Sequence, residues 1–219
     1  MKVIAVNGSP RQKGWNTVTM LESALEGARS AGAETELIQL YGLDFSGCLS
    51  CFSCKKLNRK QDGFCAIQDD LTPVLASIRE NCGALVLGTP VYYGCETAAV
   101  RAFLERLCYP NTKYDKARTS LFPRRIPTGL IYTMNVSQEV LADYGYEAQF
   151  EKTRSLLERM LGPCQLLLAT GTMQYSDYAK YESEMFDPQA RIKRHDEVFP
   201  QDCERARELG ARMATEEGS

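Results

Sequence analysis

Short apolar runs alternate with amphipathic stretches along most of the 219-residue chain, and this alternation is the strongest constraint on its fold. Apolar runs of this length are typical of buried parallel strands, and the stretches between them are typical of the connecting helices. The pattern predicts a doubly wound α/β fold whose five-stranded parallel sheet has the order 2-1-3-4-5. The predicted strands cover residues 2–7, 34–40, 84–88, 128–133 and 165–169.

Apolar residues at helical spacing mark the helices between these strands. In the first helix, 16–30, they share one face, and Asn16 is a suitable N-cap. Later helices follow the same rule, including one that opens after Asp70. The remaining predicted helices cover Val100 to Leu107, 150–161 and 203–214.

The predicted fold occupies one domain at 1–171, and residues 172–219 form a C-terminal extension with the closing helix of the same domain. Two segments exceed the loops that such a domain needs: a cysteine-rich insertion at 47–68, and a polar, aromatic segment at 175–201. Loops this long are usually functional or contact a partner. We expect the aromatic residues of 175–201 to pack on a neighbour, and we assign the single histidine, His195, no catalytic role.

Composition limits the partners and the compartment that we expect. The formal net charge of -2 argues against a nucleic-acid or acidic-membrane partner. Because no apolar run has the length of a membrane span or of a signal-peptide core, we expect a cytoplasmic protein. Thiols are normally reduced there, so the nine cysteines favour metal binding or redox chemistry over disulfides.

The segment between the first predicted strand and its helix, 8–17, concentrates groups that bind anions. Hydroxyl, amide and guanidinium groups, together with the positive end of a helix, suit a phosphate group. The segment lacks the dinucleotide and P-loop glycine patterns, which leaves a monophosphate site or an ordinary, well-capped turn. The predicted phosphate donors are Ser9, Arg11, Asn16 and Thr17.

A second loop follows the third predicted strand and carries a proline, two tyrosines and a glycine. In the predicted strand order it lies beside the first loop, at the crevice where sheets of this kind bind ligands. Its tyrosines could stack on an aromatic ring or shield it from water, and the alternative is a plain loop with half-buried tyrosines. The candidate ring-binding residues are Pro90, Val91, Tyr92, Tyr93 and Gly94, with Thr170-Gly171-Thr172 as a further wall.

The cysteine-rich insertion carries the most distinctive spacing in the chain. Three cysteines at x2 spacing can surround one corner of an iron–sulfur cubane, and a distant fourth completes a four-thiolate set. A structural zinc and reduced or redox-active thiols are the other interpretations. The candidate ligands are Cys48, Cys51, Cys54 and Cys65, whereas we expect Cys82, Cys108, Cys164 and Cys203 in the core.

These segments together resemble one family. The first loop is similar to the Gly-Ser-Pro-Arg…Gly-Asn-Thr signature of NADPH-dependent FMN reductases and iron–sulfur flavoproteins, with Trp15 inserted before Asn16. The second resembles their Pro-x-Tyr-x-Gly segment, and the cysteines resemble the compact iron–sulfur motif with a longer final gap. The resemblance covers about residues 1–171 and implies a flavodoxin-like fold, FMN, a [4Fe–4S] cluster and a homo-oligomer.

The sequence therefore predicts an FMN-dependent oxidoreductase that accepts electrons from NAD(P)H and passes them to a small-molecule or protein acceptor, directly or through a cluster. Because a bound flavin carries the redox chemistry, we expect no catalytic side chain. Two alternatives stay open: an electron-transfer flavoprotein fed by ferredoxin, and an FMN-binding thiol sensor of redox state.

Overall fold

Five parallel strands form one sheet in the order β2-β1-β3-β4-β5, which confirms the predicted topology. The structure is a computed structural model and describes residues 1–57, 63–182 and 184–216, so part of the cysteine-rich insertion, 58–62, lies outside the described residues. The strands are β1 (Lys2–Asn7), β2 (Glu34–Gln39), β3 (Cys82–Pro90), β4 (Thr128–Thr133) and β5 (Cys164–Ala169).

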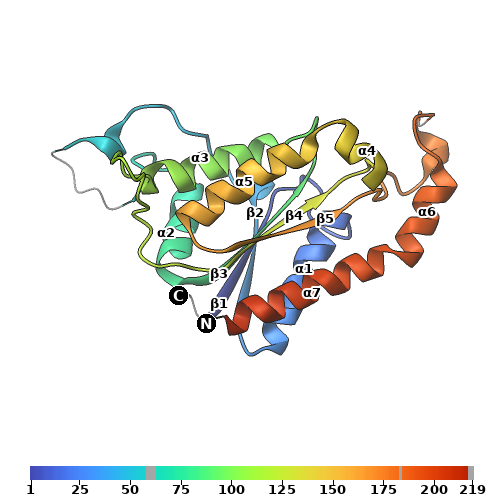
Figure 1. The fold of residues 1–219 in the computed structure, drawn as a ribbon, viewed down its shortest axis with the longest axis horizontal. Coiled ribbons are helices and arrows are strands. Elements are labelled where there is room, and N and C mark those ends of the chain that lie inside the picture. The colour runs from blue at the N-terminus through green and yellow to red at the C-terminus, as the bar shows by residue number, and fades with distance from the viewer. Residues whose placement is uncertain (58–62, 183, 217–219) are drawn as a thin grey trace.

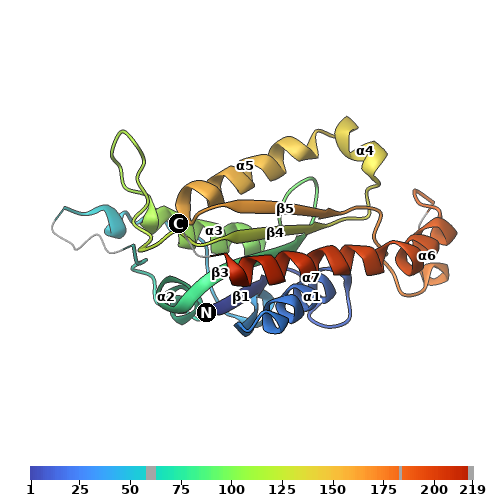
Figure 2. The ribbon, with the colours of Figure 1, turned by 60° about the horizontal axis from the view of Figure 1, so that its bottom comes forward.

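Helices cover both faces of this sheet, as Figures 1 and 2 show. Alternate residues of β1 enter the two cores: Val3 and Ala5 join one, and Ile4 and Val6 the other. Burial on both sides explains why this strand reads as a continuous apolar run. One face carries α1 (Asn16–Ser30) and α7 (Phe199–Thr215), and the other carries α2 (Leu71–Asn81), α3 (Ala98–Asn111), α4 (Gln138–Asp143) and α5 (Tyr146–Met160).

The close contact between α1 and α7 depends on glycine. A Cβ atom at Gly27 of α1 would lie 1.9 Å from the carbonyl oxygen of Arg207 in α7. A Cβ atom at Gly210 of α7 would lie 1.8 Å from the carbonyl oxygen of Ala24 in α1. The two backbones therefore approach at a distance that no larger residue at these positions allows.

Two helices were not predicted. Ser137 precedes α4, in which only Leu141 is buried, so the helix shows almost no apolar stripe. The helix α6 (Pro188–Glu197) has no buried residue and lies within the predicted irregular segment 175–201. It begins where Asp187 accepts hydrogen bonds from two backbone N–H groups. A start signal alone predicts a helix poorly, because apolar periodicity is the stronger sign.

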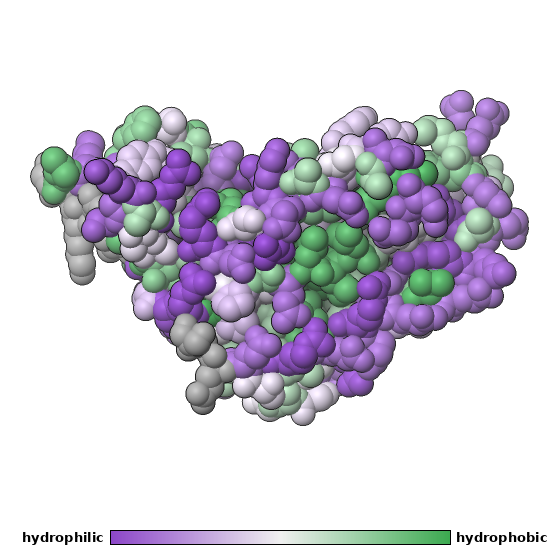
Figure 3. Space-filling view, in the orientation of Figure 1, coloured by the Kyte–Doolittle hydropathy of each residue, from purple (hydrophilic) through white to green (hydrophobic). Residues whose placement is uncertain are grey.

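The sheet ends in an exposed edge at β5. Residues 165–168 of this strand are half-buried, including three consecutive leucines. Figure 3 shows apolar surface in the middle of the face where β5 runs between α5 and α7 in Figure 1. In the described part of the chain, no helix is both long and apolar enough to span a membrane.

Three of the four cysteines predicted in the core, Cys82, Cys108 and Cys164, are buried there. Cys203, on α7, is only half-buried, although it packs against the core of this face. Burial raises the pKa of Cys82 and of Cys108 to about 12, so both thiols stay protonated at neutral pH. These residues are structural, and they are separate from the cysteines of the insertion.

Candidate functional site

The two predicted loops meet where β1 and β3 end side by side. The Gly8 N–H donates to the carbonyl oxygen of Gly88 at 2.8 Å, and the Thr97 hydroxyl donates to the carbonyl oxygen of Gly8 at 2.8 Å. A Cβ atom at Gly8 would lie 2.0 Å from a methyl carbon of Val100, so only glycine fits there. The first loop is therefore fixed against the start of α3.

An open cleft of about 190 Å³ lies at this edge of the sheet. It contains all four predicted phosphate donors and three of the five predicted ring-binding residues. Walls that the sequence did not indicate come from the end of β4 and the segment after it. Of the predicted further wall after β5, Thr172 lines the cleft, whereas Thr170 and Gly171 do not. The lining residues are Ser9, Arg11, Trp15, Asn16, Thr17, Pro90, Val91, Tyr92, Thr133, Met134, Asn135, Thr172, Met173 and Gln174.

Tyr93 and Gly94 do not line this cleft. They are the central residues of a tight turn that is closed by two backbone hydrogen bonds between Tyr92 and Cys95, at 2.9 and 3.1 Å. Both have positive φ angles, 51° at Tyr93 and 80° at Gly94, as a type I′ turn requires. The turn places Tyr92 at the cleft and leaves the Tyr93 ring fully exposed at the tip.

Hydrogen bonds among its own residues hold the shape of the first loop, which follows β1. The Ser9 N–H donates to the side-chain oxygen of Asn7 at 3.0 Å, and the Arg11 N–H donates to the Ser9 hydroxyl oxygen at 3.1 Å. Because Ser9 accepts from its own loop, its O–H remains available to donate into the cleft. Asn7, which the sequence analysis did not single out, orients this loop.

Two predicted phosphate donors bond to the segment that follows β5. An Nη atom of Arg11 donates to the carbonyl oxygen of Gln174 at 2.7 Å, while its guanidinium lies 3.9 Å from the centre of the Trp15 ring. The Asn16 amide donates to the carbonyl oxygen of Met173 at 2.8 Å. The prediction of Asn16 as N-cap is therefore wrong: it is the first helical residue, and Trp15 occupies the cap position.

The chemistry of the cleft fits an FMN phosphate. Within the described residues, no side chain caps the N-terminus of α1, so its backbone N–H groups and positive dipole end stay available. Ser9 and Arg11 add a hydroxyl and a cation beside this helix end. The Thr17 hydroxyl, by contrast, is buried against that of Thr133, with 2.7 Å between the oxygens. This combination suits an anion better than a neutral ligand.

The four cysteines of the insertion line a second, small pocket at the far end of α3. Their other neighbours there include Leu49, Phe52 and Tyr109. Ser50 and Phe52, which lie between the cysteines, both adopt left-handed backbone conformations with φ near 53° and 55°. Each such residue costs about 1–3 kcal/mol, so contacts around the segment must hold this shape.

The arrangement of the four thiols in this pocket bears on metal binding. Among residues 1–57, 63–182 and 184–216, no three His, Cys, Asp or Glu side chains lie close enough together to hold a metal ion. Burial raises the pKa of Cys54, and the neighbouring thiols of Cys65 and Cys48 act in the same direction. Four thiols in one pocket are a donor set that suits an iron–sulfur cluster.

The two pockets lie at opposite ends of α3. The cleft loop Pro90–Cys95 precedes this 14-residue helix, whereas the cysteine pocket contacts Tyr109 and Pro110 near its end. A helix of this length spans about 20 Å. Figures 1 and 2 show the cysteine segment at the end of the molecule opposite α6.

The aromatic residues of the C-terminal extension pack mainly on one another. The rings of Tyr175 and Tyr181 stack with centroids 4.3 Å apart, and Tyr178 meets Tyr175 edge to face. His195 stacks on Phe199 at 5.1 Å and is half-buried. It does not line the cleft.

Comparison with known proteins relates the chain to one protein family. The model of the NADPH-dependent FMN reductase family matches residues 1–122. An iron–sulfur flavoprotein of Methanocaldococcus jannaschii is 37% identical over 106 residues, covering 48% of this chain and 51% of the relative. One of Archaeoglobus fulgidus is 32% identical over 130 residues, covering 59% and 60%. The chain thus spans about half to three fifths of the length of these relatives.

Solved structures share the fold over nearly the whole chain. An NAD(P)H:quinone oxidoreductase from Methanothermobacter marburgensis has a TM-score of 0.71 at 18% identity, covering 96% of this chain and 98% of its own. An FMN-dependent NADH-azoreductase from Bacillus anthracis has a TM-score of 0.65 at 14% identity, covering 98% and 100%. At these identities the likeness shows the fold alone.

Proposed function

Because the chain belongs to the NADPH-dependent FMN reductase family, we propose that it binds one FMN in the cleft and works as an NAD(P)H-dependent oxidoreductase. The observation that carries this proposal is the uncapped N-terminus of α1, which opens beside Ser9 and Arg11 in a cleft at the carboxyl ends of the strands. Ligands bind α/β sheets of this order at that place.

Each part of the cleft has a role in this proposal. Ser9, Arg11, Asn16 and Thr17 with the α1 N–H groups hold the phosphate. For this, Arg11 and Asn16 exchange their present backbone partners, and the Thr17 hydroxyl exchanges its contact with Thr133. Pro90, Val91 and Tyr92 hold one edge of the ring, and Tyr93 and Gly94 form the exposed tip beside it. When bound, FMN accepts a hydride and releases electrons singly, so the side chains need only bind, orient and shield it.

The phosphate contact gives a sharp test with Arg11→Met and two ligands, FMN and riboflavin, which lacks the phosphate. A charged hydrogen bond contributes about 1.5–3 kcal/mol, so the variant should bind FMN roughly 10- to 150-fold more weakly. Its affinity for riboflavin should match that of the unchanged chain. Fluorescence titration measures both affinities. An equal loss for both ligands would place the phosphate elsewhere, and a chain that binds no FMN would refute the proposal.

We also propose that Cys48, Cys51, Cys54 and Cys65 hold a [4Fe–4S] cluster, which would transfer electrons singly. Four thiols in one apolar pocket support this assignment, as does the name of the relatives. Iron and acid-labile sulfide should reach about four of each per chain after anaerobic reconstitution. Cys54→Ser should lower both, while Cys203→Ser, at a half-buried position on α7, should leave them unchanged. Bound zinc, or thiols without iron, would contradict the cluster.

A second function, electron transfer from ferredoxin without turnover of NAD(P)H, is favoured by one observation. The chain segment that carries Cys48, Cys51 and Cys54 lies at one end of the molecule (Figure 1), and Cys51 is exposed, so a protein donor could reach it. Steady-state oxidation of NADH and NADPH separates the two functions. Turnover with either nucleotide supports the reductase, whereas reduction by ferredoxin alone supports the electron-transfer protein.

A further inference from the structure

Arg106 is an unusual residue for the middle of α3, because its side chain is fully buried. A buried guanidinium is unfavourable unless its charge and its N–H groups are matched. Asp69 matches the charge: its carboxylate accepts from the two terminal nitrogens of Arg106 at 2.6 and 3.1 Å. This fork-to-fork pair is the strongest geometry available to the two side chains.

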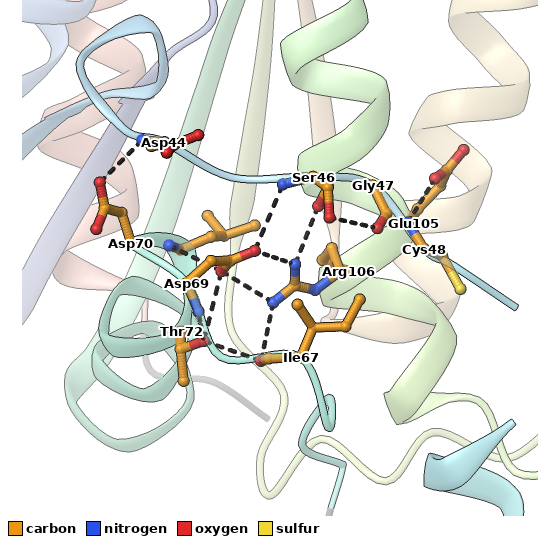
Figure 4. Close-up of polar contacts among 11 residues, drawn as sticks. Asp44, Ser46, Gly47, Cys48, Ile67, Asp69, Asp70, Thr72, Glu105 and Arg106 are labelled. Carbon is orange, nitrogen blue, oxygen red and sulfur yellow. Dashed lines mark hydrogen bonds and ion pairs between the residues drawn. The ribbon is translucent and has the colours of Figure 1, made fainter. Parts of the chain in front are cut away.

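The same two nitrogens bond to the backbone on both sides of the cysteines. One donates to the carbonyl oxygen of Ser46 at 3.0 Å, and the other donates to that of Ile67 at 3.3 Å. Ser46 lies two residues before Cys48, and Ile67 lies two residues after Cys65. Figure 4 shows the guanidinium between these two chain segments. The side chain of Arg106 thus joins α3 by hydrogen bonds to both ends of the cysteine segment, the part of the chain from Cys48 to Cys65.

Hydrogen bonds of Asp69 and Glu105 support these contacts of Arg106. The carboxylate of Asp69 also accepts from the Leu71 N–H at 3.2 Å, in the first turn of α2, whose N-cap residue Asp70 makes no side-chain cap bond. Glu105, which directly precedes Arg106 on α3, accepts from the Cys48 N–H at 3.0 Å. The start of the cysteine segment is therefore held by two consecutive residues of one helix (Figure 4).

One N–H group of Arg106 remains without a hydrogen-bond partner within the described residues. It is the Nε–H, and it is buried. Arg106 and Cys65 line the same pocket. A guanidinium keeps its proton in proteins, so Arg106 is a buried cation whose charge Asp69 balances. A cation with a spare donor therefore stands beside the sulfur atoms.

We propose that Arg106 is a positioning residue for the cysteine pocket: it fixes both ends of the segment and supplies a buried positive charge and an N–H donor to thiolate sulfur. The proposal rests on the assignment of these cysteines as cluster ligands. A cation beside an anionic cluster stabilises the reduced form more than the oxidised form, because reduction adds negative charge. Arg106 should therefore both retain the cluster and raise its reduction potential.

The test uses the full chain with Arg106→Lys and Arg106→Gln. Arg207→Gln is the control, because it removes an exposed guanidinium whose partner, Glu204, lies on the same helix. Both Arg106 variants should keep FMN, which binds at the other end of α3. Arg106→Gln should lose iron to a chelator at least tenfold faster and have a lower cluster potential. Arg106→Lys keeps the positive charge but not the paired N–H groups of the guanidinium. It should lose iron faster, while the reduction potential of the cluster stays nearly unchanged.

Equal iron loss and equal potential in Arg106→Gln, with FMN retained, would overturn the proposal. If Arg106→Gln does not fold, Arg106→Lys decides through its rate of iron loss. If the unchanged chain takes up no iron, the cluster assignment fails, and a metal-free measurement decides the role of Arg106. Alkylation of Cys48 and Cys65, followed by mass spectrometry, should then be at least tenfold faster in the variants. Unchanged alkylation rates would show that Arg106 does not position the segment.

Discussion

Glu96 and Tyr132 form a buried polar contact behind the cleft. The Tyr132 hydroxyl donates to the Glu96 carboxylate, and Arg101 lies 3.4 Å from its other oxygen. Burial, and then the Glu96 charge, raise the pKa of Tyr132, so its hydroxyl stays protonated and remains a donor. Glu96 follows the turn Tyr92–Cys95 directly, so this contact holds the cleft loop to β4.

Removing that hydroxyl should therefore destabilise the fold. Tyr132→Phe keeps the ring, which stacks on Phe150 at 4.1 Å, but leaves a buried carboxylate with one donor fewer. The expected loss is about 1–3 kcal/mol of unfolding free energy, measured by chemical denaturation. Tyr109→Phe is the matched control, because its hydroxyl bonds to Tyr114 at an exposed site. A loss no larger than that of the control would show that Glu96 does not need Tyr132.

At the scale of elements, the contact between α1 and α7 joins the two ends of the chain. Its close approach at Gly27 and Gly210 lets small residues, Ala24 and Ala206 among them, pack without gaps. The helix α1 also presents its N-terminus to the cleft, so its position affects the proposed phosphate site. The C-terminal helix therefore supports a site to which it contributes no lining residue.

Gly27→Ala separates two opposing effects in this contact. Helix propensity alone would stabilise the variant by up to about 1 kcal/mol. The added Cβ atom would instead meet the backbone oxygen of Arg207 at 1.9 Å, so the helices must move apart at a cost of roughly 1–3 kcal/mol or more. We expect net destabilisation in thermal unfolding. Ser30→Ala, an exposed change on the same helix, is the control, and a stabilised Gly27→Ala would contradict the close packing.

For the whole molecule, the separation of the two pockets bears on assembly. The cysteine pocket begins at Glu105, about 10 Å along α3 from the first residue of the helix, and it shares no lining residue with the cleft. A neighbouring chain could bring its own cysteine pocket closer to this cleft. The apolar edge of β5 is one surface available for such a contact, because edge strands leave backbone groups unpaired (Figure 3).

We therefore expect a homo-oligomer in solution, as the family resemblance also implies. Sedimentation velocity over a range of concentrations should give a species larger than one chain. Amide hydrogen exchange in β5 should be slower at high concentration than at low concentration if this edge is covered. A species of single-chain mass throughout, with full oxidoreductase activity, would rule out assembly as part of the mechanism.

Much of the architecture could be predicted from the sequence because it depends on local periodicity. The helix 16–30 and the strands 2–7 and 128–133 have the predicted bounds, since each buries one stripe or both faces. The sheet order followed from the alternation of elements and the handedness of their connections. The anion-binding loop and the cysteine spacing were visible as residue types at fixed intervals, before any contact was known.

Tertiary structure alone decided how these residues are used. Arg11 donates to Gln174, 163 positions along the chain, and Arg106 of α3 donates to Ser46, just before the cysteine-rich insertion, and to Ile67 within it. No local pattern can reveal these contacts. The turn that points Tyr93 away from the cleft likewise depends on backbone conformation. Sequence periodicity reports which face of an element is buried, whereas side-chain partners depend on which elements the fold brings together.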